Sequence, residues 1–285
     1  GHGKRMYPIT RATSKQLLPV YDKPLIYYSL SVLLEAGIRD ILVISKPEHL
    51  GSFQELLGDG SQLGINIVYR PQPTRGGIAE AFVIGRDFIG DDDVALVLGD
   101  NVFHGSGFGD KLKTAQKNAA DGQATIFGYR VDDPQHFGVV EFDDDGNAVS
   151  LEEKPLEPRS NYVVTGLYFY PSDVCDYASR LQPSTRGELE ITDLNRMYLD
   201  DKRLKVQQLG RGFAWFDTGT IDRLFSVGEY IRSVQEATGV KVAALEEIAY
   251  DAGWIRRAQL LKLADGLKKT EYGHYLEKIA LSTRR

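Results

Sequence analysis

Short runs of apolar, mostly β-branched residues alternate with longer stretches of helical periodicity through the first half of the chain, and this alternation restricts the possible fold strongly. Continuous apolarity within each run indicates a strand that is covered on both faces of a sheet. The pattern predicts an α/β fold with a mainly parallel sheet flanked by helices. The expected strands are 41–45, 65–69, 94–98 and 124–128, and the expected helices are 24–36, 53–57, 78–88 and 111–119.

The pattern changes after Val131. Residues 138–142 and 149–153 are typical of two strands joined by an acidic, glycine-containing turn, so we expect a β-hairpin there. Apolar residues from about 241 onward recur at helical intervals, which predicts a C-terminal helical appendage over 241–285 behind a domain of residues 1–240. The remaining expected elements are strands 162–170, 204–209 and 213–216 and helices 174–181, 189–199 and 221–234.

The charge balance and the few cysteines limit the classes of function. Of the 285 residues, 34 are Lys or Arg and 40 are Asp or Glu, so the formal charge of −6 argues against nucleic acid as a partner. The lone Cys175 cannot form an internal disulfide, and the five histidines are scattered, so we expect a reducing cytoplasm and no thiolate metal site. No apolar run is long enough to cross a membrane, and we expect no membrane partner.

A glycine-containing turn opens the chain. Gly1 and Gly3 give a flexible backbone whose N–H groups could approach a phosphate chain, and Arg5 and Lys15 could neutralise its charge. Such a turn normally follows a buried strand, and the given sequence has no strand before Gly1. Glycines near a terminus are also common as plain turn formers, so this feature alone leaves both interpretations open.

Two acidic residues each follow an apolar run that predicts a strand. Asp100 comes after 96–98, and Asp217 comes after 214–216. Ligands collect at the carboxyl ends of strands in open α/β sheets, and carboxylates with phosphate oxygens are the ligands that Mg²⁺ prefers. Two such residues could therefore share one metal ion. The alternative is that they cap the turn or helix that follows, and Thr220 is the better candidate for the cap of helix 221–234.

Two further segments carry polar groups that could bind a ligand. Glu153 and Lys154 end the predicted hairpin beside Pro155, where a lysine could contact a phosphate, although a solvated turn explains the same residues. Gln72 and Gly77 lie in a loop before helix 78–88, where an amide side chain and free backbone groups could match the edge of a pyrimidine. Neither segment is specific by itself.

Taken together, these segments match a known family in order and spacing, over essentially the whole chain. They resemble the sugar-nucleotide pyrophosphorylases, and among them the enzymes that use dTTP. The motifs that carry the resemblance are Gly-x-Gly-x-Arg-x-x-Pro-x-Thr at 1–10, Ser-Lys-Gln-Leu-Leu-Pro-Val at 14–20, Tyr-Asp-Lys-Pro at 21–24, Gly-Asp-Asn at 99–101, Phe-Gly-Val-Val-Glu at 137–141, Glu-Glu-Lys-Pro at 152–155, Gly-Glu-Leu-Glu-Ile-Thr-Asp at 187–193 and Trp-Phe-Asp-Thr-Gly at 215–219.

The resemblance implies a Rossmann-like fold and a nucleotidyltransferase that makes dTDP-glucose and pyrophosphate from dTTP and glucose 1-phosphate with Mg²⁺. It implies a nucleotide part at about 1–130 and a sugar part, with the hairpin, at about 131–220. It also implies a homotetramer that a downstream dTDP-sugar inhibits. The implied roles are catalysis by Arg5, Lys15 and Lys154, nucleotide binding by Gly1, Gly3, Arg5, Lys15, Gln72, Gly77 and Asp100, sugar binding by Gly138, Glu153, Lys154 and Val164, and metal binding by Asp100 and Asp217.

Three alternatives remain open from the sequence. A sibling enzyme would use UTP or GTP, and a catalytically silent homologue would bind a sugar nucleotide without turnover. Retention of Asp100, Asp217 and the three candidate cations argues against the silent homologue. A glycosyltransferase would carry an Asp-x-Asp metal pair, but 91–93 precedes its strand, so we interpret it as a solvated loop.

Overall fold

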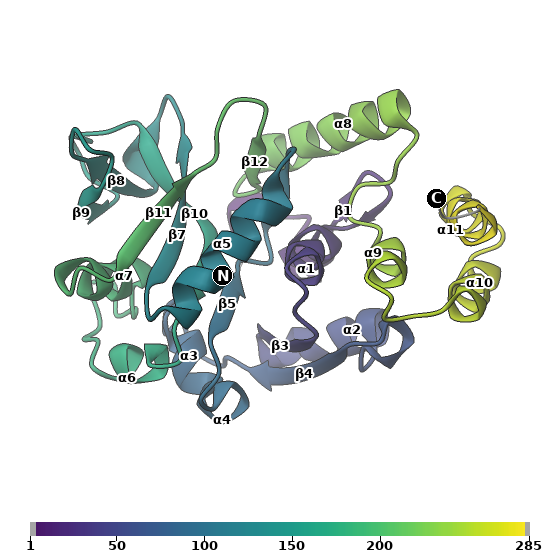
Figure 1. Ribbon diagram of the computed structural model, residues 1–285, viewed down its shortest axis with the longest axis horizontal. Helices are drawn as coiled ribbons and strands as arrows, with labels where there is room; N and C mark the ends of the chain where they lie inside the picture. Colours follow the sequence, from purple (N-terminus) through teal and green to yellow (C-terminus); the bar gives the residue numbers. More distant parts are fainter. Residues whose placement is uncertain (1–3, 283–285) are drawn as a thin grey trace. The chain divides into compact units, whose positions relative to one another are not determined.

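The structure is a computed structural model that describes residues 4–282, and the chain divides into two compact units (Figure 1). Unit 1 comprises residues 1–69, 99–102 and 216–285, and unit 2 comprises residues 70–98 and 103–215. Strands β6 (Asn101–His104) and β12 (Ala214–Asp217) pair with each other. The division into nucleotide and sugar parts implied by the resemblance concerns function and stays a prediction.

Unit 2 contains a six-stranded sheet in which β10 (Tyr162–Tyr170) is central. β10 runs antiparallel to three neighbours, and the β7–β11 pair is parallel. The α/β class is confirmed, but the expectation of a mainly parallel sheet is wrong here, because apolar runs show that strands are buried and do not show their direction. The other strands are β5 (Val94–Val97), β7 (Ala124–Arg130), β8 (Gly138–Phe142), β9 (Ala148–Glu153) and β11 (Leu204–Gln208).

The predicted hairpin is present as the antiparallel pair β8 and β9. Its turn holds Asp143, whose carboxylate accepts hydrogen bonds from the backbone N–H groups of Asp145 and Asn147 at 3.0 and 2.8 Å. Aspartate favours such turns because its short side chain can replace a backbone acceptor. Gly138 and Glu153 are paired across the open end of the hairpin.

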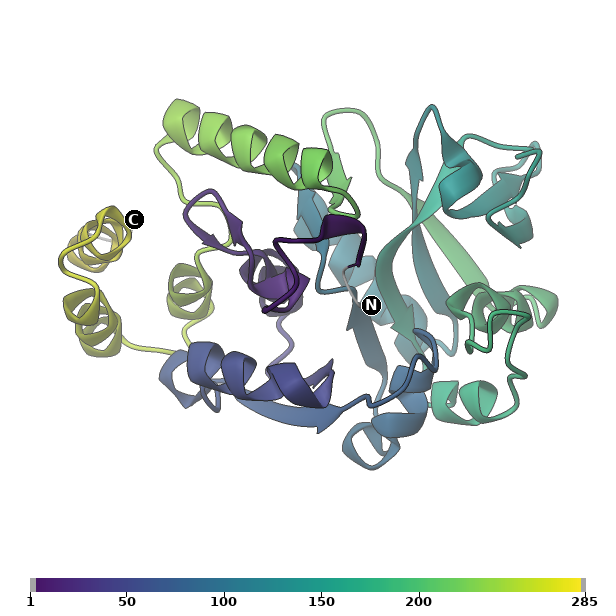
Figure 2. The ribbon, with the colours of Figure 1, turned by 180° about the vertical axis from the view of Figure 1, so that it is seen from behind.

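Helices of unit 2 pack around the sheet, and α5 runs alongside β7 in Figures 1 and 2. One expected helix, 78–88, is two short helices because Gly85, at φ −89° and ψ 0°, lies outside the helical region. Glycine inside a helical pattern lowers helix stability, which explains the break. The helices are α3 (Glu80–Ile84), α4 (Arg86–Ile89), α5 (Phe108–Ala120), α6 (Val174–Ser179) and α7 (Ile191–Asp200), with a 3₁₀ turn η4 (Pro134–His136).

Unit 1 is organised around α1 (Leu25–Glu35), nearly all of whose residues are buried. A helix that is buried on nearly every side needs packing partners all round, and the neighbours of α1 include η2 (Lys15–Leu17) and α9 (Leu245–Asp251). Helix α2 begins at Pro47, six residues before the expected start at Phe53, because proline suits the first helical turn. The remaining N-terminal elements are η1 (Lys4–Met6), η2 (Lys15–Leu17), β1 (Pro19–Val20), β2 (Lys23–Pro24), β3 (Asp40–Ser45), α2 (Pro47–Leu57), η3 (Ser61–Leu63) and β4 (Asn66–Pro71).

Four helices follow Asp217 and end the described chain. Helix α8 (Ile221–Thr238) is capped by Thr220, whose side-chain oxygen accepts a hydrogen bond from the Arg223 N–H at 3.3 Å, as expected. Val227 and Ile231, four residues apart, are fully buried and anchor it. The expected C-terminal helices are present as α9 (Leu245–Asp251), α10 (Arg257–Gly266) and α11 (Glu271–Leu281), and α10 lies beside α11 in both ribbon views.

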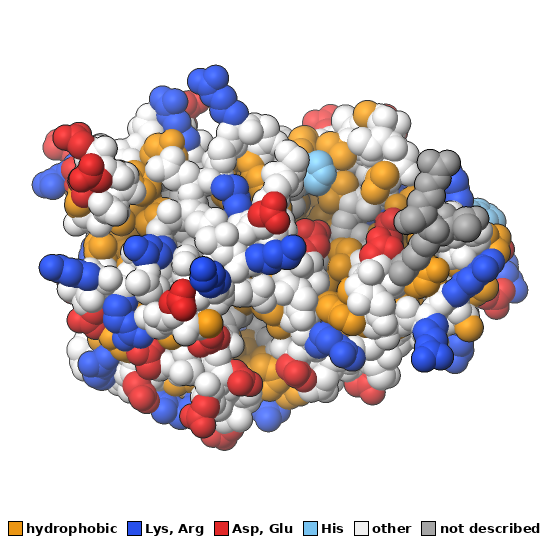
Figure 3. Space-filling view, in the orientation of Figure 1, with side chains coloured by type: hydrophobic (Ala, Val, Ile, Leu, Met, Phe, Trp, Pro, Cys, Tyr) orange, Lys and Arg blue, Asp and Glu red, His pale blue; other side chains and the backbone are white. Residues whose placement is uncertain are grey.

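The visible surface carries charges of both signs. Figure 3 shows basic and acidic side chains interspersed over that face, as the sequence composition predicts. Among residues 4–282, no helix is long and apolar enough to cross a membrane.

The core of unit 2 yields a test of packing. Leu194 on α7 is fully buried, whereas Leu156, after the hairpin, is 97% exposed. Leu194→Ala is expected to lower the free energy of unfolding by about 2–5 kcal/mol, because it removes packed methyl groups and leaves a cavity. The matched control Leu156→Ala should change it by less than about 0.5 kcal/mol. Urea unfolding followed by circular dichroism measures both, and equal losses would contradict the packing described.

Candidate active site

Asp100 forms an ion pair that is mostly shielded from solvent. Lys15 Nζ lies 2.5 Å from Asp100 Oδ2, and the side chains of Lys15 and Asp100 are 12% and 24% exposed. Asn101 Nδ2 donates a second hydrogen bond, to Asp100 Oδ1, at 2.9 Å. Burial alone would raise the pKa of Asp100, but the charge and hydrogen bond of Lys15 outweigh it and hold this pKa below its ordinary value. Asp100 is therefore a carboxylate at neutral pH.

Local structure fixes both members of this pair. Lys15 begins η2, and the preceding Ser14 is buried. Asp100 follows Gly99, where a Cβ would lie 3.0 Å from Gln16 Cγ and 3.2 Å from Ile26 Cδ1. The absence of a side chain at Gly99 therefore allows Asp100 to approach the segment that carries Lys15.

Thr218, the residue after Asp217, holds this segment next to Asp100. The backbone N–H and the hydroxyl of the fully buried Thr218 both donate hydrogen bonds to the Asp100 carbonyl, at 3.2 and 2.9 Å. Burial raises the pKa of Asp217, and the negative charge of Asp100 raises it further, while Lys15 acts in the opposite direction. The two acids, 117 positions apart in the chain by their residue numbers, therefore share one electrostatic environment in unit 1.

Two arginines contribute to this cluster. The Arg223 guanidinium lies 3.6 Å from Asp217 Oδ2, and the positive charges of Arg223 and Arg5 both favour the ionised form of Asp217. Arg5, in η1, is exposed to solvent. The predicted phosphate-binding residues Gly1 and Gly3 lie outside the described residues. Unit 1 thus combines two acids with three cations, and Arg223 is a member that the sequence did not indicate.

This donor set fits a divalent cation that is shared with a substrate. Among residues 4–282 there is no group of three or more His, Cys, Asp or Glu side chains that could hold a metal ion without other ligands. Two carboxylates leave most positions around an ion open for phosphate oxygens and water, which is how Mg²⁺ is commonly bound at nucleotides. Asp100 and Asp217 are the residues that could hold it.

The predicted sugar-binding residues of unit 2 lie together at the open end of the hairpin. A Cβ at Gly138 would lie 3.5 Å from Glu153 Oε2 and 3.9 Å from Val164 Cβ, and only 3.1 Å from Thr192 Oγ1. Glycine at 138 therefore keeps a small space open between β8, β9 and β10. Three of the residues assigned by resemblance line this space.

Glu153 is held by three donors. Thr192 Oγ1 donates to Glu153 Oε2 at 2.6 Å, while Lys154 Nζ and Arg186 Nη2 lie 3.0 and 3.4 Å from Glu153 Oε1. Burial would raise the pKa of Glu153, but these partners outweigh it and keep the pKa low. Lys154 adopts φ 47°, and its N–H donates to the Phe137 carbonyl at 2.9 Å, which fixes the end of the hairpin.

Arg186 and Thr192 are residues of this cluster that the sequence reasoning missed. Arg186 pairs with Glu190 at 2.8 Å as well as with Glu153. Thr192 belongs to the motif 187–193 that was used for the resemblance, and Arg186 directly precedes it. The position of Arg186 directly before a recognised motif is a signal that the sequence offers. Nothing in the sequence identifies Glu153 in β9 as its partner.

The predicted base-binding residues Gln72 and Gly77 contact each other. Gln72 Nε2 donates to the Gly77 carbonyl at 3.0 Å and to Glu80 Oε2 at 2.7 Å. Gly77 has φ +92°, and a Cβ there would lie 2.3 Å from the Leu189 carbonyl oxygen, so no other residue fits without a shift of the backbone. The Leu189 N–H in turn donates to the Gly76 carbonyl at 2.8 Å, which fixes this loop against the segment before α7.

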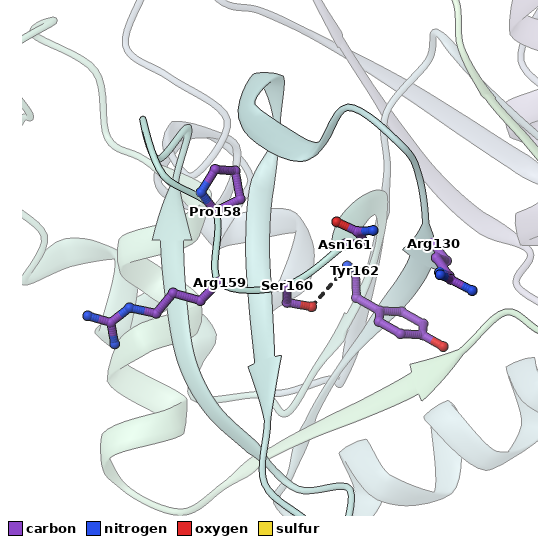
Figure 4. Close-up of a pocket in the computed structure, with 6 residues that line it drawn as sticks. All are labelled: Arg130, Pro158, Arg159, Ser160, Asn161 and Tyr162. Atoms are coloured by element: carbon purple, nitrogen blue, oxygen red, sulfur yellow. Dashed lines mark hydrogen bonds between the residues drawn. The ribbon is translucent and has the colours of Figure 1, made fainter.

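A cavity of unit 2 lies apart from these residues. It is lined by Arg130, Pro158, Arg159, Ser160, Asn161 and Tyr162. Figure 4 shows the two arginine side chains pointing in different directions, and Ser160 Oγ accepts a hydrogen bond from the Tyr162 N–H at 3.0 Å. None of the lining residues is a predicted site residue, and their charges do not converge.

Comparisons with known proteins agree with this architecture. Residues 1–234 match the family model described as nucleotidyl transferase. A glucose-1-phosphate thymidylyltransferase of Neisseria gonorrhoeae is 56% identical over 276 residues, which cover 97% of this chain and 95% of that protein. A protein of the same name from Mycobacterium tuberculosis strain H37Rv is 52% identical over 276 residues, with the same coverage of 97% and 95%.

Two solved structures have a similar fold. A Bacillus anthracis protein assigned as a glucose-1-phosphate thymidylyltransferase, in complex with a sucrose, has a TM-score of 0.75 and 39% identity, covering 81% of this chain and 92% of that one. A UDP-glucose pyrophosphorylase complexed with UDP-glucose has a TM-score of 0.72 at 22% identity, covering 82% and 96% of the two chains, which shows a shared fold only.

The chain belongs to the nucleotidyl transferase family, whose model matches residues 1–234. Nucleotidyltransferases of this kind generally use a divalent metal ion, which agrees with the donor set of unit 1. Within the family, this chain is similar along nearly its whole length to the glucose-1-phosphate thymidylyltransferases.

The opposite pKa shifts of the two acids predict opposite effects of neutral substitutions. Because the pKa of Asp217 is raised, its ionisation above that pKa destabilises the fold, so Asp217→Asn should leave the melting temperature in EDTA at mildly alkaline pH unchanged or higher. Because the pKa of Asp100 is lowered by Lys15, Asp100→Asn should cost about 1–3 kcal/mol. Calorimetry of both variants without metal checks this, and equal losses would mean that Asp217 has a structural role.

Proposed function

We propose that this protein transfers a thymidylyl group from dTTP to glucose 1-phosphate, giving dTDP-glucose and pyrophosphate. The observation that carries the proposal is the pairing of Asp100 and Asp217 with Lys15 in one partly buried cluster of unit 1. Similarity at 56% identity to a named glucose-1-phosphate thymidylyltransferase supports the choice of substrates.

The chemistry needs no side-chain nucleophile. A phosphate oxygen of the sugar phosphate is already anionic and can attack the α-phosphorus of the nucleotide in line, with pyrophosphate leaving. The obstacle is the repulsion between two polyanions, so the protein must align them and neutralise charge. Mg²⁺, held by Asp100 and Asp217, would supply positive charge at the phosphates when bound.

The residues of unit 1 are proposed to bind the triphosphate. Lys15 and Arg5 carry positive charges that already act on the carboxylates of the cluster, so phosphate oxygens that enter it would meet them directly. Because Lys15 is only 12% exposed, its charge is poorly screened by water and its interaction with a phosphate is correspondingly strong. Lys15 would therefore stabilise the charge that develops on the leaving pyrophosphate.

The residues of unit 2 are proposed to bind the base and the sugar phosphate. The low pKa of Glu153 keeps its carboxylate ionised, ready to accept hydrogen bonds from sugar hydroxyls beside Gly138 and Val164. Lys154 would bind the sugar phosphate, and Gln72 with Gly77 would meet the thymine. The tetramer and its inhibition by a dTDP-sugar are part of the same proposal, and sedimentation would measure the assembly.

A pyrophosphate-release assay tests the reaction. Purified protein with glucose 1-phosphate and Mg²⁺ is expected to release pyrophosphate with dTTP, and more slowly with UTP, GTP or CTP. Release that stops on addition of EDTA and returns with excess Mg²⁺ would support the metal requirement. Absence of release with every nucleotide would reject the enzyme and favour a silent homologue.

Replacing the buried cation gives a quantitative test. Lys15→Gln is expected to lower kcat by roughly a hundredfold, which is about 3 kcal/mol, because one stabilising charge is lost in the transition state. Lys268→Gln serves as a control, since its ammonium group pairs with Asp265 on an exposed surface. Steady-state kinetics and melting curves are measured together. A loss of rate in Lys15→Gln that only follows a loss of folded protein would contradict the catalytic role.

A further inference from the structure

The amide of Gln72 is held in one orientation by two groups that can only accept hydrogen bonds. Its Nε2 atom lies 2.7 Å from the Glu80 carboxylate and 3.0 Å from the Gly77 carbonyl oxygen. An amide NH₂ group has two N–H donors, so both are used within the protein. The carbonyl oxygen Oε1 is therefore the polar atom of this side chain that remains for a ligand.

The local backbone fixes the position of Glu80. It is the first residue of α3, where a negative charge is favoured, and its carboxylate lies against Gly76. A Cβ at Gly76 would lie only 2.0 Å from Glu80 Cδ, so any side chain there would displace the carboxylate. Gly76 and Gly77 thus place, side by side, the two acceptors that fix the amide.

We propose that Glu80 is a positioning residue that determines base specificity by making Gln72 present only an acceptor. This inference rests on the proposed function, in which Gln72 meets the nucleotide base. An acceptor at this place matches the ring N–H of thymine or uracil. Cytosine has an unprotonated ring nitrogen at the same position, so two acceptors would face each other and neither would have a donor.

The prediction is that Glu80 controls the preference for dTTP over dCTP. Glu80→Met has similar length and no acceptor of comparable strength, so only the Gly77 carbonyl still holds the Gln72 NH₂ group. Rotation of the amide by half a turn, which offers the NH₂ group to cytosine, then costs one hydrogen bond in place of two. The ratio of kcat/KM for dTTP to that for dCTP should fall by about tenfold or more. Glu80→Gln retains an oxygen acceptor and should keep the ratio within about threefold of the parent protein.

A second set of variants separates orientation of the amide from general stability. If Glu80 acts through Gln72, then adding Glu80→Met to Gln72→Met should not change the dTTP to dCTP ratio further. Glu55→Met, on the exposed side of α2, is the control for loss of one surface carboxylate and should leave the ratio unchanged. Melting curves accompany each variant, and Glu80→Ala replaces Glu80→Met if the latter does not fold.

The outcomes distinguish this inference from the proposed reaction. If the parent protein turns over no nucleotide, the proposed function fails, and calorimetric titration with dTTP and dCTP then measures the same preference without turnover. If the parent prefers dTTP and Glu80→Met keeps that preference, or if Glu80→Met changes the ratio equally in the Gln72→Met background, the role assigned to Glu80 is overturned.

Discussion

The neutralisation of partly buried charge is the constraint on which the candidate site of unit 1 depends. A carboxylate that is removed from water must find a cation or several hydrogen-bond donors, or its pKa rises until it is protonated. Asp100 meets this requirement through Lys15 and Asn101, whereas Asp217 meets it less completely and keeps a raised pKa. This imbalance suits a site that binds a further cation, because a divalent ion would satisfy the acid that the protein leaves incompletely paired.

The same rule explains the cluster of unit 2. Glu153 receives donors from Thr192, Lys154 and Arg186, and its pKa is low despite its burial. The two cations among these donors, Lys154 and Arg186, form ion pairs with the same carboxylate. Glycines supply the remaining condition, since Gly138 and Gly77 keep space where a side chain would collide with neighbouring atoms. Ion pairs between side chains, together with glycines at crowded positions, therefore shape the candidate sites of both units.

Most secondary structure could be predicted because it depends on local patterns. The apolar strand β7, the hairpin of β8 and β9, and helix α8 with its Thr220 cap lie within a few residues of their expected positions. Strand β6 was missed because its four residues are too few to show a strand pattern, and it is defined by pairing with β12. The antiparallel direction of β10 was also missed, since direction follows from how distant segments meet and leaves no mark on the composition of a strand.

The sequence by itself determined the family and the candidate residues for its chemistry, because the motifs that contain Lys15, Asp100, Glu153, Lys154 and Asp217 match a family in order along the chain. The roles of these residues stay a proposal. Only the tertiary structure decided their partners. Arg186 reaches Glu153 across 33 residues, and Glu80 reaches Gln72 from the next helix. Hydrogen bonds and ion pairs act over a few ångströms, so they depend on how the chain folds back on itself, and that proximity cannot be inferred from local pattern.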